Sequence, residues 1–175
     1  LFQRIGQSEE EAIEETARLL AQAAIGQGTV YFATFGELEA IAIQAQHSVQ
    51  PFAKFARYEE AIELMPADRV IIFTRQASDE QALTLARKLH EAFIPFAAVA
   101  SEVASDENEL SDLAYTYISL KMRGGILPHP TKLGERIVFP HMMAALYIYE
   151  AIKMEFDEMV AGDEDDEEAS ASPFA

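Results

Sequence analysis

The sequence contains no cysteine among its 175 residues. The protein can therefore form neither disulfide bonds nor thiolate metal sites, and it has no cysteine nucleophile. No apolar run approaches the ~18 residues that a membrane-spanning helix needs. No secretory leader is recognisable at the start of the sequence, so we expect a cytoplasmic protein that does not interact with membranes.

Positive charge is also scarce, with 13 lysine and arginine residues against 30 aspartate and glutamate residues and a net charge of −17 at pH 7. Nucleic-acid binding needs a basic surface, so this balance argues against it. The same charge repels an anionic substrate at long range. Any phosphate site must therefore act locally, through backbone N–H groups and helix dipoles.

Half of the residues are hydrophobic, which suffices for the core of one domain. The clearest pattern covers residues 68–101 and reads as strand, loop, helix and strand. Residues 70–74 (VIIFT) form a β-branched apolar run typical of a strand buried on both faces. A β-α-β unit of this kind implies a parallel sheet with helices on its faces, and ligands bind such sheets at the carboxyl ends of the strands. The loop after Thr74 is therefore the expected position of a site.

The other segments fit the same α/β plan. Ser8 is a candidate helix N-cap that forms a capping box with Glu11. The patterns predict, in chain order, helix 8–26, strand 29–35, helix 37–49, edge strand 52–57, a helical turn at 109–114, strand 115–120, a Gly- and Pro-rich loop at 123–134, strand 136–139 and helix 140–159. The last helix is apolar on most sides, which favours burial against the sheet and contact with a second subunit. Residues 161–175 carry a run of six acidic residues and are expected to form a disordered tail.

This order of elements resembles the sugar isomerase (SIS) domain family, from about Glu10 to Met159. The residues that carry the resemblance are D-x-V-I-I-F-T-R-Q-A-S at 68–78, then a helix, a strand and the segment L-S-D-L-A at 110–114. Within that family the likeness is to the phosphoheptose isomerases and to an uncharacterised bacterial group of SIS-like proteins. The resemblance implies a three-layer αβα sandwich with a mostly parallel five-stranded sheet in flavodoxin-like order.

The resemblance also implies a phosphosugar site at the carboxyl edge of that sheet. The residues of this chain at the corresponding positions are Thr34, Gly36, Thr74, Arg75 and Ser78. The family's serine- and glycine-rich loop is only partly retained here, because Gln76 and Ala77 replace a serine and the glycine.

The family's acid and base residues are mostly absent. Its helix after the first strand carries a histidine and a glutamate where this chain has Gln44 and Ser48, and Leu146 replaces a histidine of the last helix. We therefore expect a module that binds a sugar phosphate without classical isomerase catalysis. One alternative is an active isomerase that uses Glu37, Glu39 or His141 (with His47 nearby) in a shifted arrangement. A non-catalytic structural or regulatory dimer is the other.

Several residues allow a structural interpretation beside the functional one. Ser78 is either a phosphate ligand or the N-cap of the following helix, and Arg75 either binds an anion or pairs with Asp79. His141 is either a ligand-facing side chain or a histidine of the core or the subunit interface. The four histidines show no metal-binding spacing, so we expect no metal and no cofactor. The expected partners are a small-molecule sugar phosphate and further copies of the chain, bound through the last helix.

Overall fold

A five-stranded sheet forms the centre of the computed structural model, which describes residues 1–102, 107–122 and 124–171. Its strands are β1 (Val30–Thr34), β2 (Phe55–Arg57), β3 (Arg69–Gln76), β4 (Phe96–Ser101) and β5 (Thr116–Ser119). Their order is β2-β1-β3-β4-β5, and every neighbouring pair is parallel. The predicted five-stranded parallel sheet is therefore confirmed, with residues 55–57 as one of its two edge strands.

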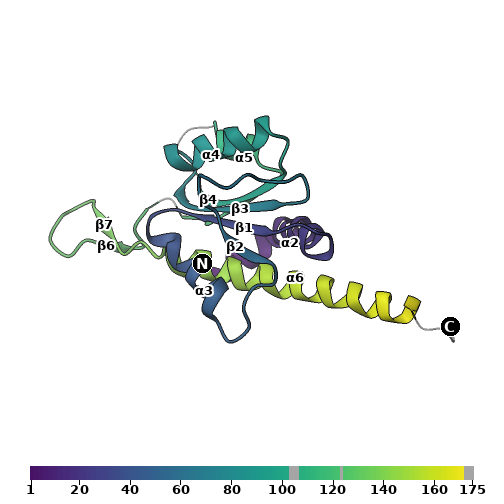
Figure 1. Cartoon of the computed structure of the whole chain (residues 1–175). Helices are drawn as coiled ribbons and strands as arrows, with labels where there is room; N and C mark the ends of the chain where they lie inside the picture. The colour runs from purple at the N-terminus through teal and green to yellow at the C-terminus, as the bar shows by residue number, and fades with distance from the viewer. Residues whose placement is uncertain (103–106, 123, 172–175) are drawn as a thin grey trace.

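Helices cover both faces of the sheet (Figure 1). They are α1 (Phe2–Ser8), α2 (Glu10–Ile25), the short 3-10 helix η1 (Gly36–Leu38), α3 (Glu39–His47), α4 (Glu80–Glu91), α5 (Glu109–Leu113) and α6 (His141–Ala171). In Figure 1, α4 and α5 lie above the sheet, and α2, α3 and α6 lie below it. A two-stranded hairpin, β6 (Leu127–Pro128) and β7 (Arg136–Ile137), projects away from this three-layer body.

The strand β3 is buried on both faces, as its apolar run predicts. Ile71 and Phe73 pack with the residues of α2 and α6, whereas Val70 and Ile72 pack with those of α4. All four side chains are at most 1% exposed. The alternation of side chains along a strand thus divides the core into two clusters, one on each side of the sheet.

Aromatic rings join the sheet to α6. Phe52 stacks on Phe156 of α6 with ring centroids 4.2 Å apart, and Phe32 of β1 meets Tyr149 of α6 edge-on at 6.1 Å. Each such pair contributes about 0.5–1.5 kcal/mol beyond the area it buries. These contacts fix the position of α6, and with it the position of the residues at its N-terminal end.

The N-terminal segment differs from the prediction. Ser8 is the last residue of a separate helix, α1, and its hydroxyl donates to the carbonyl of Arg4 (2.8 Å) instead of capping α2. Glu9, which directly precedes α2, is buried and accepts a hydrogen bond from the Ser119 amide (2.9 Å). The capping box of Ser8 and Glu11 is therefore wrong, because α2 has no side-chain cap and Glu9 bonds to the end of β5 instead.

Other boundaries move by a few residues. The predicted helix 37–49 begins as η1 and ends at His47, and α6 continues past the predicted end at Met159 to Ala171. In the part of the chain that the structure describes, none of the helices has the length and apolar character to cross a bilayer. The domain boundary at residue 160 and the disordered state of the acidic tail stay predictions.

Asp68 connects the start of β3 to the preceding turn and to β1. Its buried carboxylate accepts hydrogen bonds from the Thr29 amide (2.9 Å) and the Met65 amide (2.7 Å). Asp68→Ala should lower the free energy of unfolding by about 2–4 kcal/mol, since two amides lose a charged acceptor. Asp68→Asn keeps one acceptor oxygen, so its free energy of unfolding should lie between those of the wild type and Asp68→Ala. Urea denaturation measures both, with exposed Glu63→Ala as the control, and a loss equal to the control would refute this role.

Candidate functional site

The turn after β1 and the end of β3 meet at the carboxyl edge of the sheet. Gly36 has a φ of +61°, which glycine adopts without steric cost, and it opens η1 so that Glu37 follows the turn. Glu37 Oε1 lies 3.4 Å from Arg75 Nε. The predicted pairing of Arg75 with Asp79 is therefore wrong, because the carboxylate partner of Arg75 is Glu37. Both side chains are partly exposed, so this ion pair is weak. The binding of an anion by Arg75 stays a prediction.

Arg75 lies at an irregularity in the pairing of β3 with β4. The register with β4 shifts between Phe73 and Gln76, and β3 continues two residues beyond the predicted end at Thr74. After the shift Gln76 is paired with Ser101. Arg75 therefore leaves the regular alternation at the bulge, where such irregularities commonly redirect a side chain.

Phe139 and His141 complete this group from the start of α6. The guanidinium carbon of Arg75 lies 5.2 Å from the centre of the Phe139 ring, a cation–π distance. The Phe139 ring in turn lies 6.3 Å from the His141 ring, at an interplanar angle of 22°. We refer to Glu37, Arg75, Phe139 and His141 as the edge cluster. Sequence reasoning missed Phe139, although an aromatic residue next to Pro140 and His141 was a visible signal.

Backbone strain accompanies the edge cluster. Val138, directly before Phe139, has a φ of +63°, a conformation that is rare for a β-branched residue. Strain of this kind persists where the surrounding structure holds the chain in place, and it concentrates at functional sites. The strained residue turns the chain between β7 and α6, so it contributes to the placement of Phe139.

His141 is buried, with 4% of its surface exposed, and within the described residues its Nδ1 atom has no hydrogen-bond partner. Burial lowers the pKa of His141 below its usual range, and the charge of Arg75 lowers it further. The Phe139 carbonyl and Glu37 act in the opposite direction but are the weaker influences. The imidazole is therefore neutral near neutral pH and can accept a proton or a hydrogen bond.

A cavity of about 520 Å³ lies between the end of β1 and α4. Thr34 and Phe35 line it from β1, and Thr84 and Lys88 line it from α4. Lys88 Nζ bonds to the Tyr58 hydroxyl (3.2 Å), and Tyr58 also lines the cavity. This volume is in the range of small-molecule sites in proteins.

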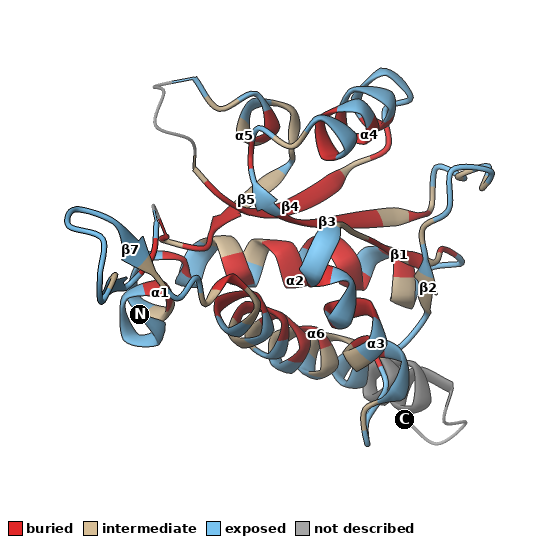
Figure 2. Ribbon diagram, turned by 90° about the vertical axis from the view of Figure 1, so that its left-hand side faces the viewer, coloured by how far each residue is buried: buried red, intermediate tan, exposed pale blue. Residues whose placement is uncertain are grey.

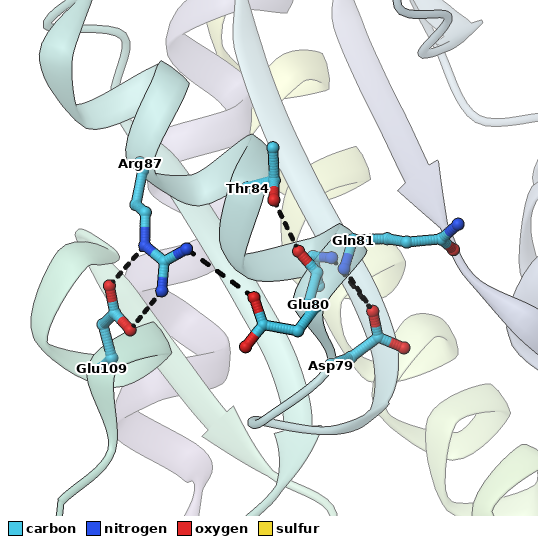
Figure 3. A network of polar contacts seen from close by, with 7 residues as sticks. Asp79, Glu80, Gln81, Thr84, Arg87 and Glu109 are labelled. Atoms are coloured by element: carbon cyan, nitrogen blue, oxygen red, sulfur yellow. Dashed lines mark hydrogen bonds and ion pairs between the residues drawn. The ribbon is translucent and has the colours of Figure 1, made fainter.

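The N-terminus of α4 is capped by Asp79, as Figure 3 shows. Asp79 Oδ1 accepts hydrogen bonds from the amides of Gln81 (2.9 Å) and Ala82 (3.1 Å). The prediction that Ser78 caps this helix is therefore wrong by one residue, and Ser78 is exposed. The helix amides that a phosphate would use already have a carboxylate acceptor, and Glu80 adds a further negative charge.

A bidentate ion pair fixes α4 against α5 in the same view (Figure 3). Arg87 Nε and Nη2 lie 2.6 and 2.7 Å from the two carboxylate oxygens of Glu109. The hydrogen bonds raise the pKa of Arg87 and lower the pKa of Glu109. This pair supports the wall of the cavity and takes no part in its lining.

The remaining predicted site residues lie outside the edge cluster. Thr34 lines the cavity, but Thr74 is completely buried, and its hydroxyl has no partner among the described residues. Glu39 is exposed in the first turn of α3 and forms no ion pair with the described part of the chain. The structure thus brings Glu37, Arg75 and His141 together. The roles of Thr34, Gly36, Thr74, Ser78 and Glu39 in ligand binding or catalysis stay predictions.

Solved structures with a similar fold include a sugar isomerase domain. The sugar isomerase domain of an RpiR transcription factor from Sphaerobacter thermophilus has a TM-score of 0.57 and 13% identity, and the match covers 95% of this chain and 90% of that one. The Vibrio vulnificus NanR protein, solved in complex with ManNAc-6P, has a TM-score of 0.62 and 12% identity, with 97% of this chain and 62% of that one covered. At these identities the likeness shows the fold, which is the SIS fold.

The chain belongs to the family described as a domain of unknown function, DUF2529, which it matches over residues 1–160. A curated relative is the uncharacterized protein YwjG of Bacillus subtilis (strain 168). The two chains are 32% identical over 161 residues, which are 91% of each chain.

Because Asp79 and not Ser78 caps α4, substitutions of these two neighbouring residues should affect stability differently. Asp79→Ala should lower the free energy of unfolding by about 1 kcal/mol, because two helix amides lose their acceptor. Ser78→Ala should change it by less than about 0.5 kcal/mol, as expected for an exposed side chain outside the cap. Thermal or urea unfolding of the two variants shows which residue caps α4. A larger loss of unfolding free energy for Ser78→Ala than for Asp79→Ala would contradict the structure.

The low pKa of His141 gives stability a specific pH dependence. The unfolded chain takes up a proton at this residue near pH ~6.5, whereas the folded chain does so only at lower pH. Lowering the pH below ~6.5 should therefore destabilise the wild type more than His141→Gln. Urea unfolding at several pH values measures this difference. NMR titration of the His141 ring should give a midpoint below ~6.5, and a midpoint at or above that value would be inconsistent with this environment.

Proposed function

We propose that this protein binds a phosphosugar, or a related small anionic carbohydrate derivative, at the carboxyl edge of its sheet and without classical isomerase catalysis. The observation that carries the proposal is Arg75, a cation held over Phe139 at the end of a central strand. Its carboxylate contact, with Glu37, is long and partly exposed, so an incoming phosphate can replace it.

The fold supports this position for the ligand. Parallel α/β sheets bind ligands outside the carboxyl ends of their strands. NanR, which has the same fold, was solved with a sugar phosphate. The phosphate is assigned here to Arg75 and not to the N-terminus of α4, because Asp79 already caps that helix.

Arg75 has the geometry to recognise a phosphate. A guanidinium group donates two parallel hydrogen bonds to phosphate oxygens, and stacking over an aromatic ring leaves these in-plane donors accessible. Glu37, once released, can accept hydrogen bonds from sugar hydroxyl groups. Thr34 and Phe35, which directly precede Gly36 and Glu37, line the cavity between β1 and α4, and we assign the carbon skeleton of the ligand to that cavity.

An active isomerase is the second candidate, and His141 is the observation that favours it. Aldose–ketose isomerisation needs a base within hydrogen-bond reach of the transferred proton. His141 is neutral near neutral pH, has an unpartnered Nδ1 in the described structure and belongs to the same cluster as Glu37. Glu39 remains a further candidate base.

We also propose that the protein associates with itself through α6, whichever of the two functions it has. Three large apolar side chains of this helix are exposed, namely Met143, Leu146 and Met154. A second copy of the chain that packs on this face would remove them from water. A regulatory or structural dimer without any ligand is the remaining alternative.

Isothermal titration with a panel of sugar phosphates tests the binding proposal. ManNAc-6P, glucose 6-phosphate and sedoheptulose 7-phosphate form a suitable panel, and at least one should bind the wild type. Arg75→Gln should weaken that binding about tenfold or more, because a charged hydrogen-bonding group is lost. Arg57→Gln, which removes the same charge from an exposed position, is the matched control. Heat from none of the ligands, or equal affinities of wild type and Arg75→Gln, would refute the proposal.

Turnover separates the two candidate functions. The bound sugar phosphate is incubated with the protein in D₂O and observed by NMR, where isomerisation appears as deuterium uptake next to the carbonyl carbon. The binding module should show none above the uncatalysed rate. Turnover that His141→Gln or Glu37→Gln abolishes would establish the isomerase instead.

A further inference from the structure

A second cavity, of about 530 Å³, lies where α1, the end of β5 and the base of the β6–β7 hairpin meet. Three cationic side chains line it, namely Arg4, Lys121 and Arg136. We infer that this cavity is a binding site for a small organic phosphate, separate from the edge cluster. It shares no residue with that cluster, and so the inference does not depend on the proposed function.

The concentration of positive charge here is unusual for this chain. The protein carries only 13 lysine and arginine residues and a net charge of −17 at pH 7, yet three of those cations share one cavity. Among the described residues that line it, no aspartate or glutamate is present. Such a focus of one charge in a concave site raises the local concentration of counter-ions of the opposite charge.

Two of the three cations have no carboxylate partner in the described structure. Arg136 donates from Nε to the Gly125 carbonyl and from Nη2 to the Ile126 carbonyl, both at 2.7 Å. Arg4 donates to the carbonyl of Lys121. Carbonyl acceptors orient a guanidinium group but do not neutralise its charge.

Only Lys121 is paired with an acid, since its Nζ lies 2.7 Å from Glu9 Oε1. The Glu9 carboxylate also accepts the Ser119 amide and is itself buried, so its position is fixed. Glu9 neutralises the charge of Lys121. The positive charges of Arg4 and Arg136 then have no acidic partner among the described residues. Their mutual repulsion is relieved when an anion with two negative charges enters the cavity.

The cations are held in place before any ligand arrives. Ile5, next to Arg4, is completely buried, and Phe2 stacks on Tyr147 of α6 at 5.2 Å. A Cβ atom on Gly125 would lie 2.7 Å from the backbone of Arg136, so the two backbones of the hairpin base approach closely. Figure 2 shows α1 beside β7. Pre-positioned donors favour tight binding because less conformational entropy is lost.

The chemistry of the lining favours a phosphate ester over other anions. Two guanidinium groups and one ammonium group match the several oxygens and the double charge of a phosphate monoester better than a single carboxylate. Met122 and Ile126 add an apolar part to the lining, which suits a short carbon skeleton. The cavity volume suffices for a ligand of that size.

Titration of the whole 175-residue chain with glycerol 2-phosphate, inorganic phosphate and acetate tests the inference. The wild type should bind glycerol 2-phosphate at millimolar concentration or below, and acetate at least about tenfold more weakly. The double variant Arg4→Gln/Arg136→Gln should weaken phosphate-ester binding about tenfold or more. The matched control is Arg18→Gln/Arg57→Gln, which removes the same charge from exposed positions.

If inorganic phosphate binds as tightly as the ester, the carbon skeleton is not recognised. That result would overturn the assignment to an organic phosphate. The inference also fails if no phosphate compound binds, if both double variants lose affinity equally, or if only Arg75→Gln abolishes binding. Arg136 also supports the hairpin, so circular dichroism melting monitors the fold. If that double variant unfolds, Arg4→Gln/Lys121→Gln decides the question in its place, with the same expected loss.

Discussion

The strand β3 pairs with β1 on one side and β4 on the other, and this central pairing determines where the helices and the sheet edge lie. Burial of β3 on both faces requires a helical layer above and below the sheet, and parallel pairing aligns the carboxyl ends of the strands at one edge. The bulge near the end of β3 then places Arg75 beside the β1 turn and the start of α6. The candidate site thus follows from the position of one central strand.

Recognition of an anion by so acidic a protein must depend on short-range contacts. The net charge of −17 at pH 7 repels anions at a distance, so the proposed sites depend on a few cations that the fold holds in place. Arg75 is held over an aromatic ring, and Arg4 and Arg136 are held by backbone carbonyls. In each case the protein fixes the guanidinium group without a buried carboxylate that would compete with the ligand.

The fold was predictable from the sequence because the apolar run of β3 and the helix–strand order allow few arrangements. The N-cap of α4 was less predictable, because Ser78 and Asp79 are both good N-cap residues. Only the turn geometry selects Asp79. Groups assembled from distant segments were not predictable. Phe139 reaches Arg75 only through the packing of α6, and Arg4 lies more than 100 residues from Lys121, whose carbonyl it contacts.

A crystal structure of the protein grown with a sugar phosphate would show where the ligand binds. We expect electron density for a phosphate group in contact with the Arg75 guanidinium, with the sugar extending towards Thr34 and Glu37 displaced from its ion pair. A ligand seated at the N-terminus of α4, with the Asp79 cap opened and Arg75 still bound to Glu37, would contradict this expectation.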